Sequence, residues 1–192
     1  TGLSYSYLDF DVDVEKSLAE GELPSRIAKV NGHTSFIQFY TQSKINLSRG
    51  LNLNAGFNSH YLLLNDNYSI EPRVGIKYNI NNEHSLGFAW GIHSRLEQLP
   101  VYFVSSNDKH PNKNLDFMKS THYVLSYQSK LSENLHLTIE PYYQVLSDVP
   151  VSPDGYSTTL NNNNTLFFDE VLKSRGTGRN YGIDFSLEKY LT

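Results

Sequence analysis

The chain contains no cysteine, only one tryptophan and one methionine, and no long hydrophobic run. The absence of cysteine excludes a disulfide framework and any thiolate metal site within these 192 residues, although it says little about the cellular compartment. An excess of charge is also lacking. The net charge of −4 gives no general reason to expect nucleic acid as a partner. No stretch approaches the roughly 18 consecutive apolar residues that a transmembrane helix needs.

Enzyme signatures are missing as well. The sequence has no Gly-x-Ser-x-Gly elbow, no His-Glu-x-x-His and no phosphate-binding glycine loop. We therefore predict no catalytic residue, no metal centre and no cofactor. The chain also begins without an initiator Met or a signal-like apolar run, and Thr1 leads almost at once into strand-like sequence. We expect an interior piece of a longer protein.

What the sequence does have is an alternation of apolar and polar residues at every second position. From Leu51 to Leu63 the odd positions are almost all apolar and the even ones begin with asparagine, glycine and histidine. Successive side chains of a strand point to opposite faces, so each such segment has one apolar and one polar face. This alternation predicts one all-β domain over residues 1–192, an antiparallel up-and-down meander of about eight long strands. We place the strands near 3–12, 34–48, 51–64, 70–80, 85–98, 117–131, 135–149 and 180–191.

The predicted connections alternate in length. Those at 48–50, 81–85 and 132–134 are short, whereas 13–33, 99–116 and 150–179 are long. If Leu47 and Leu51 share a face, the three-residue turn between them requires a left-handed residue last, which Gly50 supplies.

The same parity across the turn that follows residue 131 places Asn134 in that left-handed slot. Pro141 cannot donate a ladder hydrogen bond, which predicts a bulge or local break in its strand. In the first strand the apolar parity changes after Tyr7, which suggests a bulge or a misplaced boundary.

The direction in which the apolar face points decides the class of protein. In a soluble sandwich or barrel it forms the interior, whereas in an outer-membrane barrel it contacts lipid and the polar face lines the lumen. Three features favour the second arrangement: strands of about 11 to 15 residues, outward aromatic residues near strand ends, and short turns opposite long polar loops. The sequence thus predicts part of a larger transmembrane β-barrel.

Three segments carry a resemblance to a known family. They are IEPRVGIKYNINNEHSLGFAWGIHSR at 70–95, KSTHYVLSYQSKLSENLHLTIEPYYQVLSDVPV at 119–151, and GTGRNYGIDFSLEKYL at 176–191. Together they resemble strand pairs from the C-terminal half of the barrel of TonB-dependent outer-membrane receptors.

The resemblance implies a Gram-negative outer-membrane location and a role in importing a scarce ligand such as a siderophore, haem, cobalamin or glycan. It implies outer-membrane lipid and the imported ligand as partners, and contact with TonB through parts of the receptor that lie outside this chain. We recognise no plug domain within residues 1–192. The expected contribution of the chain is a section of barrel wall with three outer loops.

Polar residues on the predicted lumen face are the first candidates for a site: Arg73, His93, Arg95 and His122. His93 and His122 stand almost opposite one another if the loop between them folds symmetrically about residue 108. Two imidazoles can hold Zn or Cu or sense pH, but the third ligand is unassigned and a polar lumen needs no special reason to contain histidine. The charged residues could steer an anionic ligand or simply be solvated.

The long loops offer aromatic residues that could stack on a sugar ring or on the flat face of a chelate. These candidate ligand-binding residues are Tyr102, Phe103, Tyr156, Phe167 and Phe168. The alternative is that they pack against neighbouring loops.

Two other classes of protein fit the pattern. A complete eight-stranded membrane barrel (an anchor, an adhesin or a lipid-modifying enzyme) would pair its first strand with its last. A soluble carbohydrate-binding sandwich would bury the apolar faces between two sheets. A receptor wall leaves both edges unpaired, and because open edges recruit other chains, we expect the isolated chain to self-associate.

Overall fold

A computed structural model describes the chain except for residues 18–20, 22, 105–108, 162–169 and 191–192. In this described part of the chain, eight strands form one antiparallel sheet in sequence order, which confirms the predicted all-β meander. The strands are β1 (Gly2–Lys16), β2 (Ser25–Ser48), β3 (Leu51–Leu62), β4 (Asn67–Asn79), β5 (His84–Arg95), β6 (Met118–Ser132), β7 (Leu135–Val151) and β8 (Lys173–Lys189). Among the described residues, helical structure is limited to α1 (Leu99–Tyr102), η1 (Pro111–Asn114) and η2 (Thr159–Asn161). In the described part of the chain, no helix is long and apolar enough to cross a membrane.

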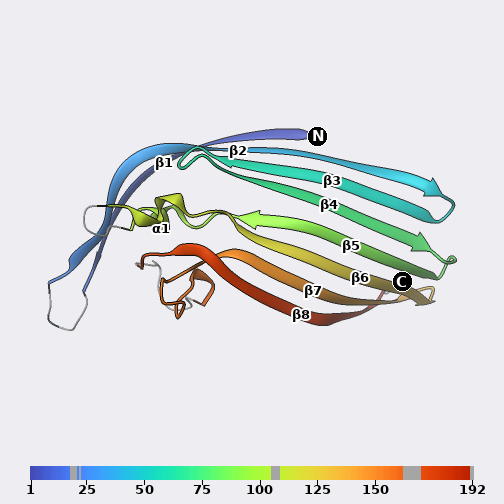
Figure 1. Ribbon diagram of the computed structural model, residues 1–192. Coiled ribbons are helices and arrows are strands. Elements are labelled where there is room, and N and C mark those ends of the chain that lie inside the picture. Colours follow the sequence, from blue (N-terminus) through green and yellow to red (C-terminus); the bar gives the residue numbers. More distant parts are fainter. Residues whose placement is uncertain (18–20, 22, 105–108, 162–169, 191–192) are drawn as a thin grey trace.

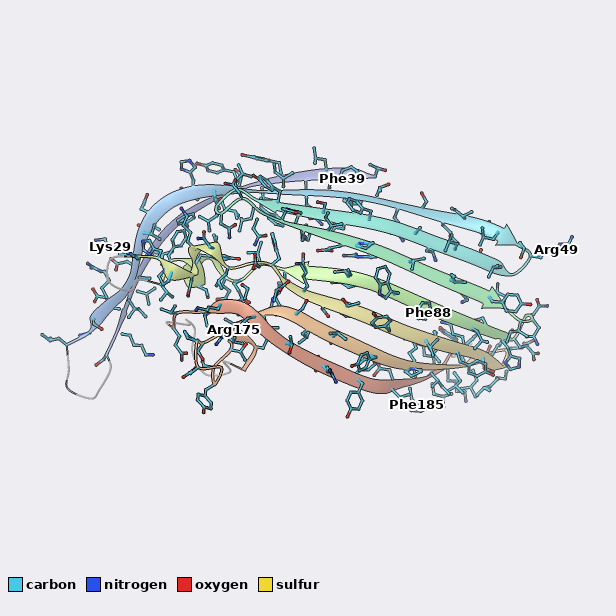
Figure 2. All side chains as sticks on the ribbon, viewed as in Figure 1. Lys29, Phe39, Arg49, Phe88, Arg175 and Phe185 are labelled. Atoms are coloured by element: carbon cyan, nitrogen blue, oxygen red, sulfur yellow. The ribbon has the colours of Figure 1, made fainter. Side chains whose placement is uncertain are left out.

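The two ends of the sheet differ as expected. Figure 1 shows the strands as a curved wall, with tight turns at one end and the long connections, including α1, at the other. Figure 2 places Arg49 at the end with the tight turns, and Lys29 and Arg175 toward the end with the long connections. Two predicted connections were too long. Much of the segment 13–33 is strand, because β1 and β2 stay paired as far as Lys16 and Ser25. The pairing is reinforced where Arg26 donates to Asp13 at 2.8 Å. The last strand begins at Lys173, within the predicted connection 150–179, and pairs there with Val151.

The two matched turns behave differently. Gly50 has a φ of +84°, and a Cβ there would lie 2.8 Å from the Asn79 carbonyl oxygen, so its left-handed assignment is confirmed. Asn134 is not left-handed: among the described non-glycine residues only Asp66 and Asp148 have positive φ. The Asn134 carbonyl instead accepts a hydrogen bond from the Tyr190 backbone N–H at 2.9 Å. This contact with the end of the last strand could not be inferred from the length of the turn.

Pro141 interrupts one ladder only. The β6–β7 pairing jumps from Val124↔Tyr142 to Tyr127↔Ile139 without a change of register, whereas β7 remains paired to β8 through Pro141. A proline has no N–H to donate, so the ladder opens on the side where that donor is missing. The predicted local break is confirmed, and it occurs without a bulge.

No bulge accompanies the parity change in β1 either. The register with β2 is unbroken from Gly2↔Tyr40 to Val14↔Ala28, so the suggested bulge after Tyr7 was wrong. The change reflects the surroundings instead. The earlier residues of the strand expose their side chains, whereas Phe10 packs against Phe103 with ring centroids 4.8 Å apart. The part of β1 around Phe10 thus turns its apolar side chains toward the long loops.

Both edges of the sheet are open. Within the described residues no ladder joins β1 to β8, and all eight strands belong to one sheet. The first finding argues against a closed eight-stranded barrel and the second against a two-sheet sandwich, so neither rival matches this architecture. Self-association of the isolated chain stays a prediction that rests on these edges.

The only sizeable apolar core among the described residues lies at the loop end of the wall, not across the sheet. We call it the loop core, and its buried members are Leu62, Val101, Tyr102, Phe103, Leu115, Phe117 and Leu172. Parts of β1 and β2 contribute partly buried side chains to its surroundings, among them Phe10 and Phe36. The core therefore anchors the long loops to one end of the wall.

Candidate functional site: the polar face of the wall

The two faces of the sheet are chemically distinct, as the alternation predicts. The apolar face is not gathered into a dry centre: Phe185 is 70% exposed and Leu125 is 56% exposed. Other large exposed apolar side chains of this face are Phe39, Ile45, Phe57, Tyr61, Ile76, Tyr78, Phe88, Tyr123, Tyr143, Tyr181, Ile183 and Leu187. Figure 2 shows Phe39 near the upper edge of the curved sheet and Phe185 near the lower edge. The opposite, polar face carries the candidate site.

Glu71 is the centre of the polar face near the loop end. Its side chain is 1% exposed, which is rare for a carboxylate unless it is fully paired. It is held by Arg73 Nη2 at 2.7 Å, Asn58 Nδ2 at 2.9 Å, the Ser94 backbone N–H at 2.9 Å, the Ser94 hydroxyl, and His60 Nδ1 at 3.2 Å. With these donors in place the negative charge is satisfied inside the wall and is turned away from solvent.

An amide fixes the orientation of His60. Asn58 Nδ2 must donate to the Glu71 carboxylate, and the same nitrogen lies 3.0 Å from His60 Nε2. Because an amide N–H₂ only donates, Nε2 accepts, and the neutral ring carries its proton on Nδ1, facing Glu71. The ring also contacts Phe117 of the loop core, with centroids 6.1 Å apart. His60 therefore links the polar network to the loops.

A groove of about 510 Å³ crosses the polar face beside this network, lined by residues from β2 to β6. Of the four polar residues proposed from the sequence, the structure brings Arg73, His93 and His122 together there. Arg95 does not line the groove and is exposed near the end of β5. Three of the four candidates thus form one cluster.

The two groove histidines are diagonal neighbours. His93 pairs with Ser120 and His122 with Gly91, so the expected opposite placement is off by one step along the polar face. Their ring centroids are nevertheless 4.7 Å apart, with the planes tilted by 59°. Within the described residues no three His, Cys, Asp or Glu side chains gather into a metal-binding group.

The aromatic residues proposed for ligand binding fall into three groups. Tyr102 and Phe103 are buried in the loop core, Tyr102 at 1% exposure, which agrees with the alternative that these rings pack against neighbouring loops. Tyr156 is 93% exposed. Phe167 and Phe168 lie outside the described residues. Ligand binding by any of these residues stays a prediction, and Tyr156 has the placement that it requires.

No sequence pattern pointed to Asn112, which organises the loops. Its buried side chain donates to the Val101 carbonyl at 3.0 Å and to the Glu170 carbonyl at 2.9 Å, and it accepts the Leu172 backbone N–H at 2.7 Å. One amide thereby ties α1 and η1 to the segment that leads into β8. A lone Asn after a proline cannot be distinguished by pattern from any other turn residue.

Burial raises the pKa of Tyr102 to about 12, against an ordinary value of 10.0. Between these two pH values the unfolded chain loses the phenol proton and the folded chain keeps it. The free energy of unfolding should therefore fall as the pH rises through this window, by about 1.4 kcal/mol per pH unit, and be fully retained below pH 10. We expect Tyr102→Phe to remove this part of the alkaline dependence in chemical unfolding. Exposed Tyr156→Phe serves as the control, and equal alkaline slopes in the two variants would contradict the prediction.

No family model matches the sequence, and a search of curated proteins found no match. Among solved structures, the chain is similar to the ferric-catecholate import receptor Fiu of E. coli K12 in its closed form, with a TM-score of 0.60. The sequences are 11% identical, and the match covers 99% of this chain and 32% of the receptor chain. The similarity shows a common fold, and this chain spans about a third of that receptor's length.

Proposed function

We propose that the chain forms part of the barrel wall and outer loops of a TonB-dependent transporter in a Gram-negative outer membrane. The observation that carries the proposal is a wall of long strands with an exposed apolar face, a polar opposite face and two open edges. Soluble proteins rarely leave so large a continuous apolar surface uncovered, whereas a membrane barrel requires one. The fold shared with an import receptor supports the same assignment.

In this proposal the transporter imports a scarce ligand such as a siderophore, haem, cobalamin or glycan. The apolar face contacts lipid, the polar face lines the lumen, and TonB binds to other parts of the receptor. The loop core holds the long connections in place, and the ring of Tyr156, which is exposed, contacts the ligand. The wall itself supplies no enzyme activity.

Cysteine labelling tests the orientation, because the chain has no cysteine of its own. We expect Tyr156→Cys to react with a membrane-impermeant maleimide on intact cells. Phe88→Cys, on the apolar face, should react only with a lipid-soluble maleimide. If the impermeant reagent labels Phe88→Cys as fast as Tyr156→Cys, the apolar face meets water and the membrane assignment fails.

A further inference from the structure

We propose that Arg73, His93 and His122 form a binding subsite for an oxyanion, namely a carboxylate or phosphate group on a small-molecule ligand. The groove that these residues line measures about 510 Å³, within the range typical of small-molecule sites. The inference depends on one element of the proposed function, namely that the polar face is in contact with water.

Arg73 supplies the fixed positive charge of the subsite. Its guanidinium has five N–H donors, of which one is directed to Glu71 Oε2 at 2.7 Å, and the side chain is 45% exposed. Glu71 itself is buried and surrounded by donors, so it orients the guanidinium without presenting its own charge to the groove. The remaining fork of donors suits a planar carboxylate or a phosphate.

Gly91 of β5 leaves space for the side chain of its neighbour Arg73. Gly91 pairs with Arg73 on one side and with His122 on the other. A Cβ at Gly91 would lie 3.1 Å from Arg73 Cγ, so the arginine side chain lies directly over this residue. Gly56 and Gly75 also line the groove, and because they have no side chains they leave room for a ligand. The small residues bring the guanidinium and the imidazoles to one place.

An amide relay makes His122 a donor. Asn180 Nδ2 donates to Gln144 Oε1 at 2.8 Å, which leaves the Gln144 amide nitrogen 2.9 Å from His122 Nε2. Because that nitrogen donates, Nε2 of the neutral ring accepts and the proton lies on Nδ1. The His93 ring, 4.7 Å away between centroids, adds a second imidazole with a polar N–H. The cluster thus offers hydrogen-bond donors beside a positive charge.

The same arrangement opposes a metal cation. His122 Nε2 is already occupied by Gln144, and the Arg73 charge lines the same groove. A structural zinc site needs four ligands and a catalytic one needs three from the protein, whereas no such group exists among the residues that the structure describes. Anion binding is therefore favoured over metal binding.

Histidine side-chain NMR of the protein in detergent micelles tests the subsite, with inorganic phosphate as the probe at constant ionic strength. We expect phosphate, but not chloride, to shift the His93 and His122 resonances saturably. Arg73→Gln should weaken phosphate binding by about tenfold or more, because a charge-assisted hydrogen bond is lost. Lys77→Gln is the matched control: it lies on the same face of β4, outside the groove, and donates to Gln128.

Arg73 also pairs with Glu71, so Arg73→Gln could unfold the wall. His93→Gln leaves the Glu71 contacts intact and should still weaken phosphate binding several-fold. Equal binding by Arg73→Gln and Lys77→Gln, or resonance shifts with Zn²⁺ but not phosphate, would overturn the subsite. Because Phe88 labelling is independent of phosphate binding, failure of the subsite and failure of the membrane assignment give different results.

Discussion

Asn112→Asp should unfold the loop core, with a loss of about 3–5 kcal/mol from its stability, the cost typical of leaving a buried charge unpaired. The wild-type amide donates to two carbonyl oxygens, those of Val101 and Glu170. A carboxylate cannot donate to either and places a negative charge against both. Only the hydrogen bond from the Leu172 backbone N–H survives the change.

Hydrogen exchange would measure this effect. We expect the amides of α1, η1 and the residues around Leu172 to lose protection in Asn112→Asp, while the strand ladders keep theirs. Acidification should restore part of the protection, because a protonated carboxyl group again has one donor. Asn114→Asp makes the same change of charge at an exposed position of the same short helix and should leave exchange unaltered. Equal exchange in the two variants would show that Asn112 does not hold the loops.

Leu125→Arg should be the most damaging single change on the apolar face. Leu125 is the central residue of the 15-residue strand β6 and is 56% exposed. An arginine facing lipid at the middle of the bilayer costs about 2–4 kcal/mol in an outer-membrane barrel. In water the same substitution would be nearly neutral, because it replaces an exposed apolar side chain by a charged one.

Ser126→Arg, one residue further along β6, is the matched control. Ser126 points to the polar face opposite Gly87, where a Cβ would lie 3.5 Å from the serine Cβ, so the neighbouring position is small. We expect a change of less than about 1 kcal/mol for this variant, since its charge remains in water. The measurement is the free energy of folding of the protein into phospholipid vesicles, from denaturant titration. A Leu125→Arg variant that folds as well as Ser126→Arg would remove the case for lipid contact.

Much of the wall could be predicted because a strand shows itself in a local pattern of apolar and polar residues. Alternation at every second residue located all eight strands and separated the apolar from the polar face. The ladder break at Pro141 and the left-handed conformation of Gly50 could also be predicted, because each is a property of one residue and its immediate neighbours. Asn134 shows the limit of this reasoning: it is not left-handed, and its carbonyl accepts a hydrogen bond from Tyr190, which lies 56 positions away in the chain.

The candidate site required the tertiary structure to a greater extent. Pattern placed Arg73, His93 and His122 on one face, but only the register shows that Gly91 brings them into one groove and that Arg95 is left out. The packing of the loops could be predicted least of all. The sequence could not decide whether Tyr102 stacks on a ligand or packs against the loops; it is buried, because the loops fold back onto β1 and β2 as well as onto each other.

By itself, then, the sequence determined the strands, their two faces and the absence of any thiol chemistry, because these follow from residue identity and from a repeat of two positions. Tertiary structure alone decided that Glu71 meets Ser94 and that Asn112 clamps Leu172. Those partners are far apart in the chain, and their meeting is set by cross-strand register and loop packing, which no local pattern encodes.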